Sequence, residues 1–151
     1  MGAPWRHPPW FAKPAARILF LRQIDQLDDV ALATVKEYRG GFSVTFTLEP
    51  LGVPRRTVIV SFKSHIPHVR VDGPSESPHR YSDGTLCMWY PGDSRDLRWM
   101  PSDGAHKLVA YIAAHLVREE WWRMNGEWLG PEVRHGRKDL HNDPKPVRSR
   151  K

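Results

Sequence analysis

The sequence has few of the features that identify several large protein classes. It contains one cysteine, Cys87, in 151 residues, which excludes an intramolecular disulfide framework and any site built from several cysteines. No apolar run approaches the roughly 18 residues that a membrane-spanning helix needs. Arg6-His7-Pro8-Pro9 stands where a secretion signal has its apolar core. We therefore expect a cytoplasmic, single-domain protein without a membrane partner.

Motifs for the common kinds of catalysis are also missing. There is no glycine-rich phosphate loop, no Gly-x-Ser-x-Gly elbow and no paired-carboxylate arrangement. His106 and His115 are nine residues apart on a predicted helix, so they do not form the i, i+4 pair of a zinc motif. We therefore expect no cofactor and no metal site, and any chemistry to be acyl transfer at the one thiol.

Positive charge is concentrated at the C-terminal end. The net charge is +6, and residues 136–151 supply +4 of it through six cations and two anions. This stretch has little to bury, so we interpret residues 137–151 as a basic mobile tail. A nucleic-acid-binding arm is the alternative, but it would depend on electrostatics alone. The tail has no aromatic residue to stack on bases, which argues against a nucleic-acid partner.

The N-terminal part of the chain predicts an arm followed by a helix. Residues 1–14 contain four prolines and are expected to form an extended arm. Its aromatic side chains are too apolar to remain in solvent, so we expect them to pack on the domain. They are Trp5, Trp10 and Phe11. Apolar residues at helical spacing predict a helix over residues 15–27. Residues 30–38 fit either more helix or a lead-in to the next element.

The middle of the chain predicts three consecutive antiparallel strands, over residues 42–49, 56–64 and 68–72. Apolar and polar residues alternate with period 2 in each stretch, which is typical of a strand with one buried face. Short connections between the stretches favour a meander. The residues expected on one shared buried face are Phe42, Val44, Phe46, Val58, Val60 and Phe62.

A long helix is predicted near the C-terminus, over about residues 102–124. Ser102 or Asp103 is the candidate N-cap, and Asn125-Gly126 is the expected stop. Its apolar stripe should lie on the sheet, and it includes Leu108, Ile112 and Leu116. Helix, meander, long loop and long helix, in this order, predict an α+β domain with helices against one antiparallel sheet.

The candidate nucleophile lies in the long loop over residues 72–101. The loop has no periodicity, but it contains apolar residues around Cys87, so we expect it to be ordered and functional. Cys87 follows a predicted Asp83-Gly84 turn and lies eight residues after His79. A lone cysteine is often a small buried hydrophobe, whereas a reactive thiolate needs nearby cations or dipoles. The candidates for that role are His79, Arg80 and Arg95.

Three stretches in and after this loop carry a resemblance. The first is the nine-residue run from His79 to Cys87, which contains a His…Gly-x-Leu-Cys pattern. It continues as Met88-Trp89-Tyr90-Pro91, and residues 126–132 read Gly-Glu-Trp-Leu-Gly-Pro-Glu before His135-Gly136. With the predicted helix, meander and helix around them, these stretches resemble the ubiquitin-conjugating-enzyme family, specifically its short bacterial members. The resemblance covers roughly residues 15–136, which we take as the domain.

The resemblance implies that Cys87 is a nucleophile. It would accept a C-terminal glycyl group as a thioester from an adenylating activating enzyme and give it to an amine, and such a thiol should be partly exposed. His79 would orient the loop or raise the thiolate fraction. Similar bacterial proteins belong to antiphage operons of the CBASS type, where a nucleotidyltransferase is modified, or the Bil type, which uses a ubiquitin-like protein. A catalytically inactive scaffold that binds such a partner is the alternative.

The sequence departs from the eukaryotic pattern at one position that matters for chemistry. That pattern has His-Pro-Asn, whose asparagine helps stabilise the oxyanion, whereas this chain has His79-Arg80-Tyr81 and a shorter loop. An oxyanion donor is worth about 2.7–4 kcal/mol in other acyl-transfer enzymes, so another group should replace it. The candidates are backbone N–H groups near Cys87, Tyr81 and His135. Asp83 and Gly84 would form the turn that presents the cysteine.

We predict that deletion of residues 137–151 leaves the melting temperature nearly unchanged. The tail cannot bury enough apolar area to offset about 1–2 kcal/mol of backbone entropy for each ordered residue. Thermal unfolding of the full-length and truncated proteins, followed by circular dichroism, tests this. A large drop in melting temperature would mean that the tail docks on the domain.

Overall fold

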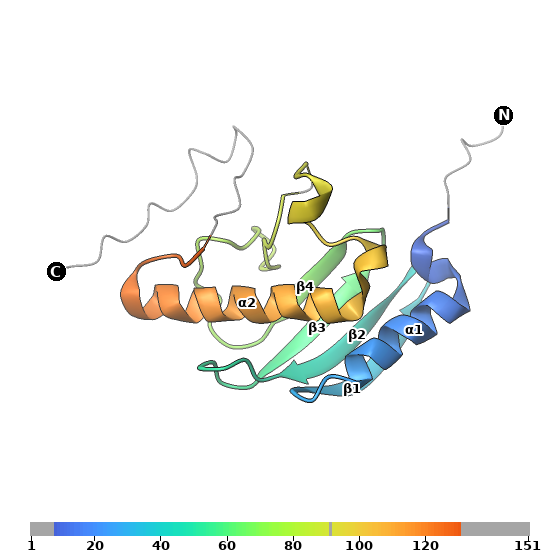
Figure 1. The fold of residues 1–151 in the computed structure, drawn as a ribbon, viewed down its shortest axis with the longest axis horizontal. Helices are drawn as coiled ribbons and strands as arrows, with labels where there is room; N and C mark the ends of the chain where they lie inside the picture. The colour runs from blue at the N-terminus through green and yellow to red at the C-terminus, as the bar shows by residue number, and fades with distance from the viewer. Residues whose placement is uncertain (1–7, 91, 131–151) are drawn as a thin grey trace.

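The sheet consists of four antiparallel strands that follow one another in sequence order (Figure 1). They are β1 (Val30–Tyr38), β2 (Gly41–Leu48), β3 (Arg56–Phe62) and β4 (Pro67–Val71). The computed structural model describes residues 8–90 and 92–130. The three strands predicted from alternation are confirmed as β2, β3 and β4. Phe42 pairs with Phe62, and Val44 with Val60. All six residues predicted for the buried face have no exposed surface.

Residues 30–38, which the sequence left open, form β1, so the meander has four strands rather than three. The pairing of β1 with β2 shifts register between Leu32 and Thr34. This irregularity interrupts the period-2 alternation, which explains why the pattern alone did not indicate a strand. The chain reverses into β2 at Gly40, whose φ of 81° favours glycine.

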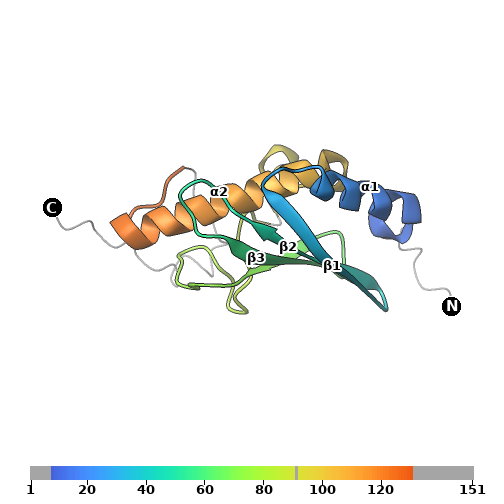
Figure 2. The same ribbon diagram turned by 90° about the horizontal axis from the view of Figure 1, so that it is seen from below.

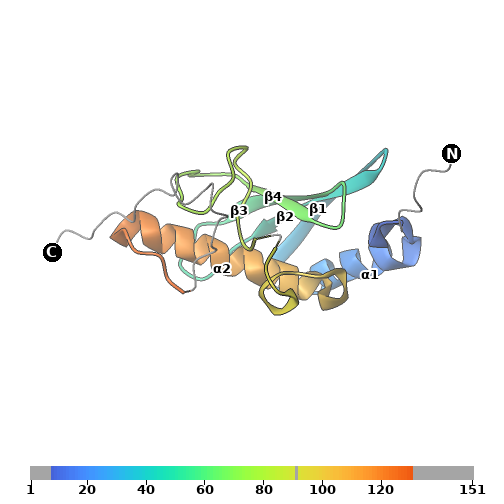
Figure 3. The same ribbon diagram turned by 90° about the horizontal axis from the view of Figure 1, so that it is seen from above.

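Two helices, α1 (Pro14–Asp25) and α2 (Gly104–Asn125), form a second layer on one face of the sheet (Figures 2 and 3). Phe20 and Ile24 of α1 are buried there. The predicted stripe of Leu108, Ile112 and Leu116 on α2 is also buried, which confirms the prediction that this face of the helix packs on the core. Helix α2 ends as predicted, because Gly126 adopts the left-handed conformation of a C-cap.

The predicted start of α2 is confirmed in position, because Asp103 is the N-cap residue, but its side chain makes no capping hydrogen bond with the helix. Its carboxylate instead accepts a hydrogen bond from the Met100 N–H at 2.7 Å, within the 3₁₀ turn Pro101–Asp103. The side chain of Gln23, on α1, instead accepts a hydrogen bond from the Ala105 N–H at 2.8 Å. A donor at the N-terminus of α2 is therefore satisfied by the neighbouring helix.

The N-terminal arm is not extended throughout, because Trp10–Ala12 form a 3₁₀ helix. The packing predicted for two of its aromatics is confirmed. Phe11 is buried in the core, and the ring of Trp10 lies 5.2 Å from that of Phe62 in an edge-to-face arrangement. Trp5 and the proposed tail at 137–151 lie outside the described residues. No helix within the described part of the chain is long and apolar enough to cross a membrane.

We predict that Ile112→Ala lowers the free energy of unfolding by about 2–5 kcal/mol, because it removes a fully buried side chain between α2 and the sheet. Urea denaturation measures the change. Leu51→Ala is the matched control, since Leu51 is 96% exposed, and it should change stability by less than about 0.5 kcal/mol. Equal effects of both substitutions would contradict the placement of the core.

Candidate active site

Cys87 lies on the second arm of a short hairpin over residues 79–87. The Gly84 N–H donates to the Tyr81 carbonyl at 2.9 Å, and Gly84 has a φ of 86°. Asp83 Oδ1 accepts hydrogen bonds from Thr85 Oγ1 at 2.6 Å and from the Thr85 N–H at 3.0 Å. These bonds hold the pKa of Asp83 below its ordinary value. The structure thus shows the turn that was predicted at Asp83 and Gly84.

The hairpin places His79 and Cys87 opposite each other. The Cys87 N–H donates to the His79 carbonyl at 3.0 Å, and Arg80 pairs with Leu86 in an antiparallel bridge. The Leu86 N–H donates to the Val69 carbonyl of β4 at 2.9 Å. The cysteine arm is therefore fixed both to the edge strand of the sheet and to the histidine arm.

The side chain of Cys87 has no exposed surface in this conformation. The expectation of a partly exposed thiol is therefore wrong here. A buried thiol in apolar surroundings is normally inert, because the thiolate is the reactive form and a reaction partner must reach it. Any acyl chemistry at this residue consequently requires a conformation in which the thiol is uncovered.

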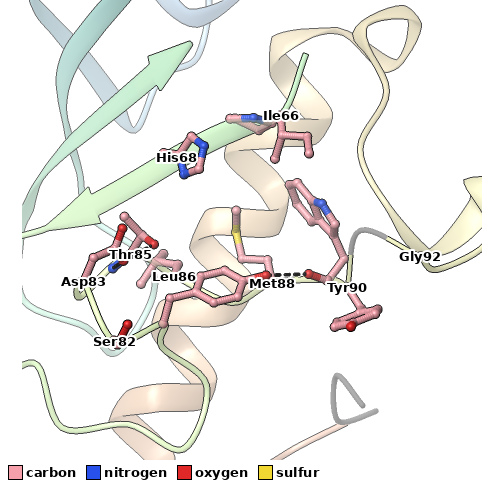
Figure 4. Close-up of a pocket in the computed structure, with 12 residues that line it drawn as sticks. Ile66, His68, Ser82, Asp83, Thr85, Leu86, Met88, Tyr90 and Gly92 are labelled. Carbon is pink, nitrogen blue, oxygen red and sulfur yellow. Dashed lines mark hydrogen bonds between the residues drawn. The ribbon is translucent and has the colours of Figure 1, made fainter. Parts of the chain in front are cut away.

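A cavity of about 770 Å³ lies between the start of β4 and the loop that carries Cys87 (Figure 4). Ile66 and His68 line it on the β4 side, and Leu86 and Met88 line it on the loop side. Cys87 stands between these two loop residues but is not part of the lining. Two of the candidate residues of the hairpin turn, Tyr81 and Asp83, contribute to the wall together with Ser82, whereas Gly84 does not line the cavity.

His79 is almost completely buried, with 3% of its surface exposed. Its ring lies 4.4 Å from the ring of Trp128, which also contacts the ring of His115 at 5.3 Å. Trp128 follows the end of α2, so the chain after the helix folds back over the hairpin. Trp128 therefore covers the ring of His79. His135 lies outside the described residues.

A buried carboxylate on α2 anchors the first arm of the hairpin. Glu119 has no exposed surface and accepts two hydrogen bonds from the Arg80 guanidinium, both 2.8 Å long. Arg123 Nη2 lies 3.5 Å from the same carboxylate, and His115 Nε2 lies 3.6 Å from it. Bidentate arginine–carboxylate pairs have a fixed relative orientation, so this contact sets the position of the hairpin on α2.

The hydrogen bonds around Glu119 stabilise its ionised form. Burial by itself would raise the pKa of this carboxyl, but the hydrogen bond from Arg80 and the nearby His115 outweigh it and lower the pKa to about 2. Glu119 is therefore a permanently charged group near neutral pH. Its charge is compensated by cations that the loop and the helix supply together.

The groups proposed to raise the acidity of Cys87 or to bind an oxyanion are engaged elsewhere. Arg80 is held by Glu119, and Arg95 donates to Ser102 Oγ at 3.1 Å. The Tyr81 N–H donates to the Thr85 carbonyl at 2.9 Å, and the Cys87 N–H donates to His79. Neither backbone N–H is available to an oxyanion in this conformation. The Tyr81 hydroxyl, on a partly exposed side chain, donates to the Trp89 carbonyl at 3.4 Å.

Comparison with known families shows which family the chain belongs to. A sequence model of the Type II CBASS E2 protein family matches residues 23–136, about three quarters of the chain. The chain belongs to this bacterial E2-like family. The match confirms the resemblance found in the sequence and favours the CBASS type over the Bil type. No curated protein matches the chain.

Sequence reasoning missed the residue that organises the site of this CBASS E2 family member. Glu119 was not singled out, although it falls three residues after Leu116 and seven after Ile112, in line with the apolar stripe of α2. A carboxylate at a core position of an amphipathic helix is a signal, because buried charges require partners. Among residues 8–90 and 92–130, no three His, Cys, Asp or Glu side chains are placed to hold a metal ion.

We predict an acid-dependent loss of stability that is caused by Glu119. Its pKa is lowered from 4.5 to about 2 on folding, so its contribution is fully present above pH 4.5 and is lost as the pH falls towards 2. The shift corresponds to a contribution on the order of 3 kcal/mol. Urea unfolding across this pH range should therefore show a smaller acid-dependent loss in Glu119→Gln than in the unsubstituted protein.

The matched control for this measurement is Glu49→Gln. Glu49 pairs with Arg55 on the surface, where its side chain is 56% exposed, and exposed ion pairs contribute little to stability. Its substitution should leave the acid-dependent loss nearly unchanged. The same pH dependence in Glu119→Gln and the unsubstituted protein would contradict a charged, hydrogen-bonded Glu119.

Proposed function

We propose that this protein carries a C-terminal glycyl group as a thioester on Cys87 and transfers it to an amine in the CBASS antiphage pathway. Family membership supports the pathway. The observation that carries the chemical proposal is the hairpin that holds the sole cysteine of the chain opposite His79. This hairpin lies inside the segment that matches the family.

The proposed reaction has two steps. In the first, the Cys87 thiolate attacks the carbonyl carbon of a thioester on an activating enzyme, and the thiolate of that enzyme leaves. In the second, the nitrogen of an acceptor amine attacks the new thioester, the Cys87 thiolate leaves, and the nitrogen loses a proton as the amide forms. Each step passes through an oxyanion that needs a hydrogen-bond donor.

His79 is proposed to act by orienting the cysteine arm. Its carbonyl accepts the Cys87 N–H, and its ring is buried against Trp128. Both contacts restrain the backbone that carries the thiol. Tyr81 is the proposed source of an oxyanion donor, because its side chain is 39% exposed and lines the cavity beside Cys87. The long 3.4 Å bond of its hydroxyl is easily exchanged for a better acceptor.

The partners follow from the same proposal. The thioester requires an adenylating activating enzyme, and the transferred group requires a protein that ends in glycine. For a CBASS protein, the proposed transferred protein is a nucleotidyltransferase or a ubiquitin-like protein. The glycyl end would reach the thiol after Cys87 becomes uncovered on binding.

The burial of Cys87 favours a second function. A member of the same family with an inaccessible thiol would bind the nucleotidyltransferase or ubiquitin-like protein as a scaffold and form no covalent bond. The fold, the cavity and the anchored hairpin are compatible with this role. The two functions differ in one measurable property, the reactivity of Cys87.

We predict that the purified protein, its operon's activating enzyme, ATP and the protein to be transferred together give an adduct that thiol reductant cleaves. Cys87→Ala should give no adduct. Cys87→Ser should give a reductant-resistant ester, because thiols exchange slowly with oxygen esters. Gel electrophoresis with and without reductant, together with intact-mass spectrometry, distinguishes the three outcomes.

The scaffold function makes the opposite prediction. If the protein is a scaffold, no variant forms an adduct. Calorimetry should then give the same affinity for the bound partner protein in Cys87→Ala as in the unsubstituted protein. An adduct that persists in Cys87→Ala would contradict the assignment of Cys87 as the nucleophile, because the acyl group would then be attached to another residue.

A further inference from the structure

We propose that Glu119 is the positioning residue of the active-site hairpin, and that it fixes the cysteine arm through Arg80, Ser77 and the backbone of His79. This inference rests on the proposed function for its catalytic consequence. The carboxylate itself is on α2 and does not line the cavity beside Cys87. Its effect on Cys87 must therefore pass through other residues.

The first link is the ion pair with Arg80, the residue next to His79. Two parallel 2.8 Å hydrogen bonds join the guanidinium to the carboxylate, and the Arg80 side chain is only 7% exposed. The fork geometry fixes both the distance and the angle between the groups. Arg80 therefore has little freedom to slide along α2, unlike an apolar side chain in the same place.

The second link is Ser77, on the other side of His79. The Ser77 side chain is among the groups that lower the pKa of the Glu119 carboxyl. The Ser77 Oγ also accepts a hydrogen bond from the His79 N–H at 3.1 Å. The histidine backbone is thus restrained from both sides by contacts that lead back to the same carboxylate.

A second arginine fixes the approach to the hairpin. Arg123, one helical turn after Glu119, donates to the Pro74 carbonyl and to the Glu76 carbonyl, both at 2.9 Å. Arg80 also donates to the Pro74 carbonyl, at 3.3 Å. The segment 74–80 is therefore attached to α2 at several points, and Glu119 orients both arginines that attach it.

The restraint reaches Cys87 through the pairing of the two arms of the hairpin. The His79 carbonyl accepts the Cys87 N–H at 3.0 Å, so a displacement of residues 77–80 displaces the thiol. A shift of about 1 Å at a reacting group can cost on the order of 100-fold in rate. On stability alone, an apolar pair of similar volume is often as good as a buried ion pair. The positioning of Cys87 gives the Glu119–Arg80 pair a role that an apolar pair could not fulfil.

The test uses two variants. Glu119→Gln keeps the shape of the side chain but removes its charge. Arg80→Lys keeps the positive charge but cannot form the two parallel hydrogen bonds of a guanidinium. Glu49→Gln is the matched control, because Glu49 is an exposed carboxylate whose ion pair is with Arg55, outside the contacts that attach residues 74–80 to α2. Hydrogen exchange of the Cys87 amide is measured first, by nuclear magnetic resonance. We expect at least a tenfold faster exchange in both test variants and no change in Glu49→Gln.

The second readout is the single-turnover discharge of the preformed Cys87 adduct to L-lysine. We expect a loss of about 10- to 100-fold in the maximal rate of both test variants, with an unchanged half-saturating lysine concentration. Faster amide exchange with unchanged discharge would overturn the inference, because Glu119 would then be only structural. Unchanged exchange would also overturn it. If the unsubstituted protein forms no adduct, the proposed function fails, and the exchange data alone decide whether Glu119 positions the hairpin.

Discussion

The ion pair between Glu119 and Arg80 is the contact on which the arrangement of the candidate site depends. A carboxylate with no exposed surface has lost its hydration, and only close cations and hydrogen-bond donors offset that cost. The loop provides Arg80 and Ser77, while α2 provides Arg123 and His115. The helix and the loop consequently adopt their positions together, because either one alone would leave a buried charge uncompensated.

The sheet and the helices form the framework that holds Glu119, on α2, within reach of Arg80, on the loop. Residues of β2 and β3 are buried on the face of the sheet that the helices cover. Helix α2 packs on this face with an apolar stripe that includes Ile112 and Leu116. The hairpin is attached to this framework twice. Its first arm is held by Glu119, and its second arm is held by β4 through the 2.9 Å bond from the Leu86 N–H to the Val69 carbonyl. The sole thiol lies between two rigid elements.

Much of this framework was predictable, because it depends on local patterns. Alternation indicated β2 to β4, and a stripe at helical spacing indicated α2. Strand β1 was not predictable, since the register shift between Leu32 and Thr34 interrupts its alternation. Within the site, the Asp83-Gly84 turn has a local signature. The partnership of Glu119 with Arg80 spans 39 residues, so only the three-dimensional fold reveals it. The burial of Cys87 likewise depends on packing that no sequence pattern records.

The proposed function requires the buried thiol to become uncovered, and the same contacts bear on which side of Cys87 would open. The side of Cys87 that faces His79 is held by the Glu119 contacts, so opening there would expose a charge that has lost its partners. The chain after Cys87 is held by a 3.4 Å bond from the Tyr81 hydroxyl to the Trp89 carbonyl and by the Trp89 ring, which packs on the Tyr111 ring of α2 at 5.3 Å. A local turn adds two bonds, in which the Asp93 N–H donates to the Tyr90 carbonyl and the Tyr90 N–H donates to Asp93 Oδ2. These contacts include no buried ion pair like that of Glu119. The main cost of moving this stretch of chain is the exposure of the largely buried Trp89. A partner that covers the apolar wall around Ile66 and Met88 can offset that cost, because Trp89 belongs to the same wall. Under the proposed function, binding at the cavity would therefore favour exposure of the thiol, and each 1.4 kcal/mol of binding preference for the open form would raise its population about tenfold.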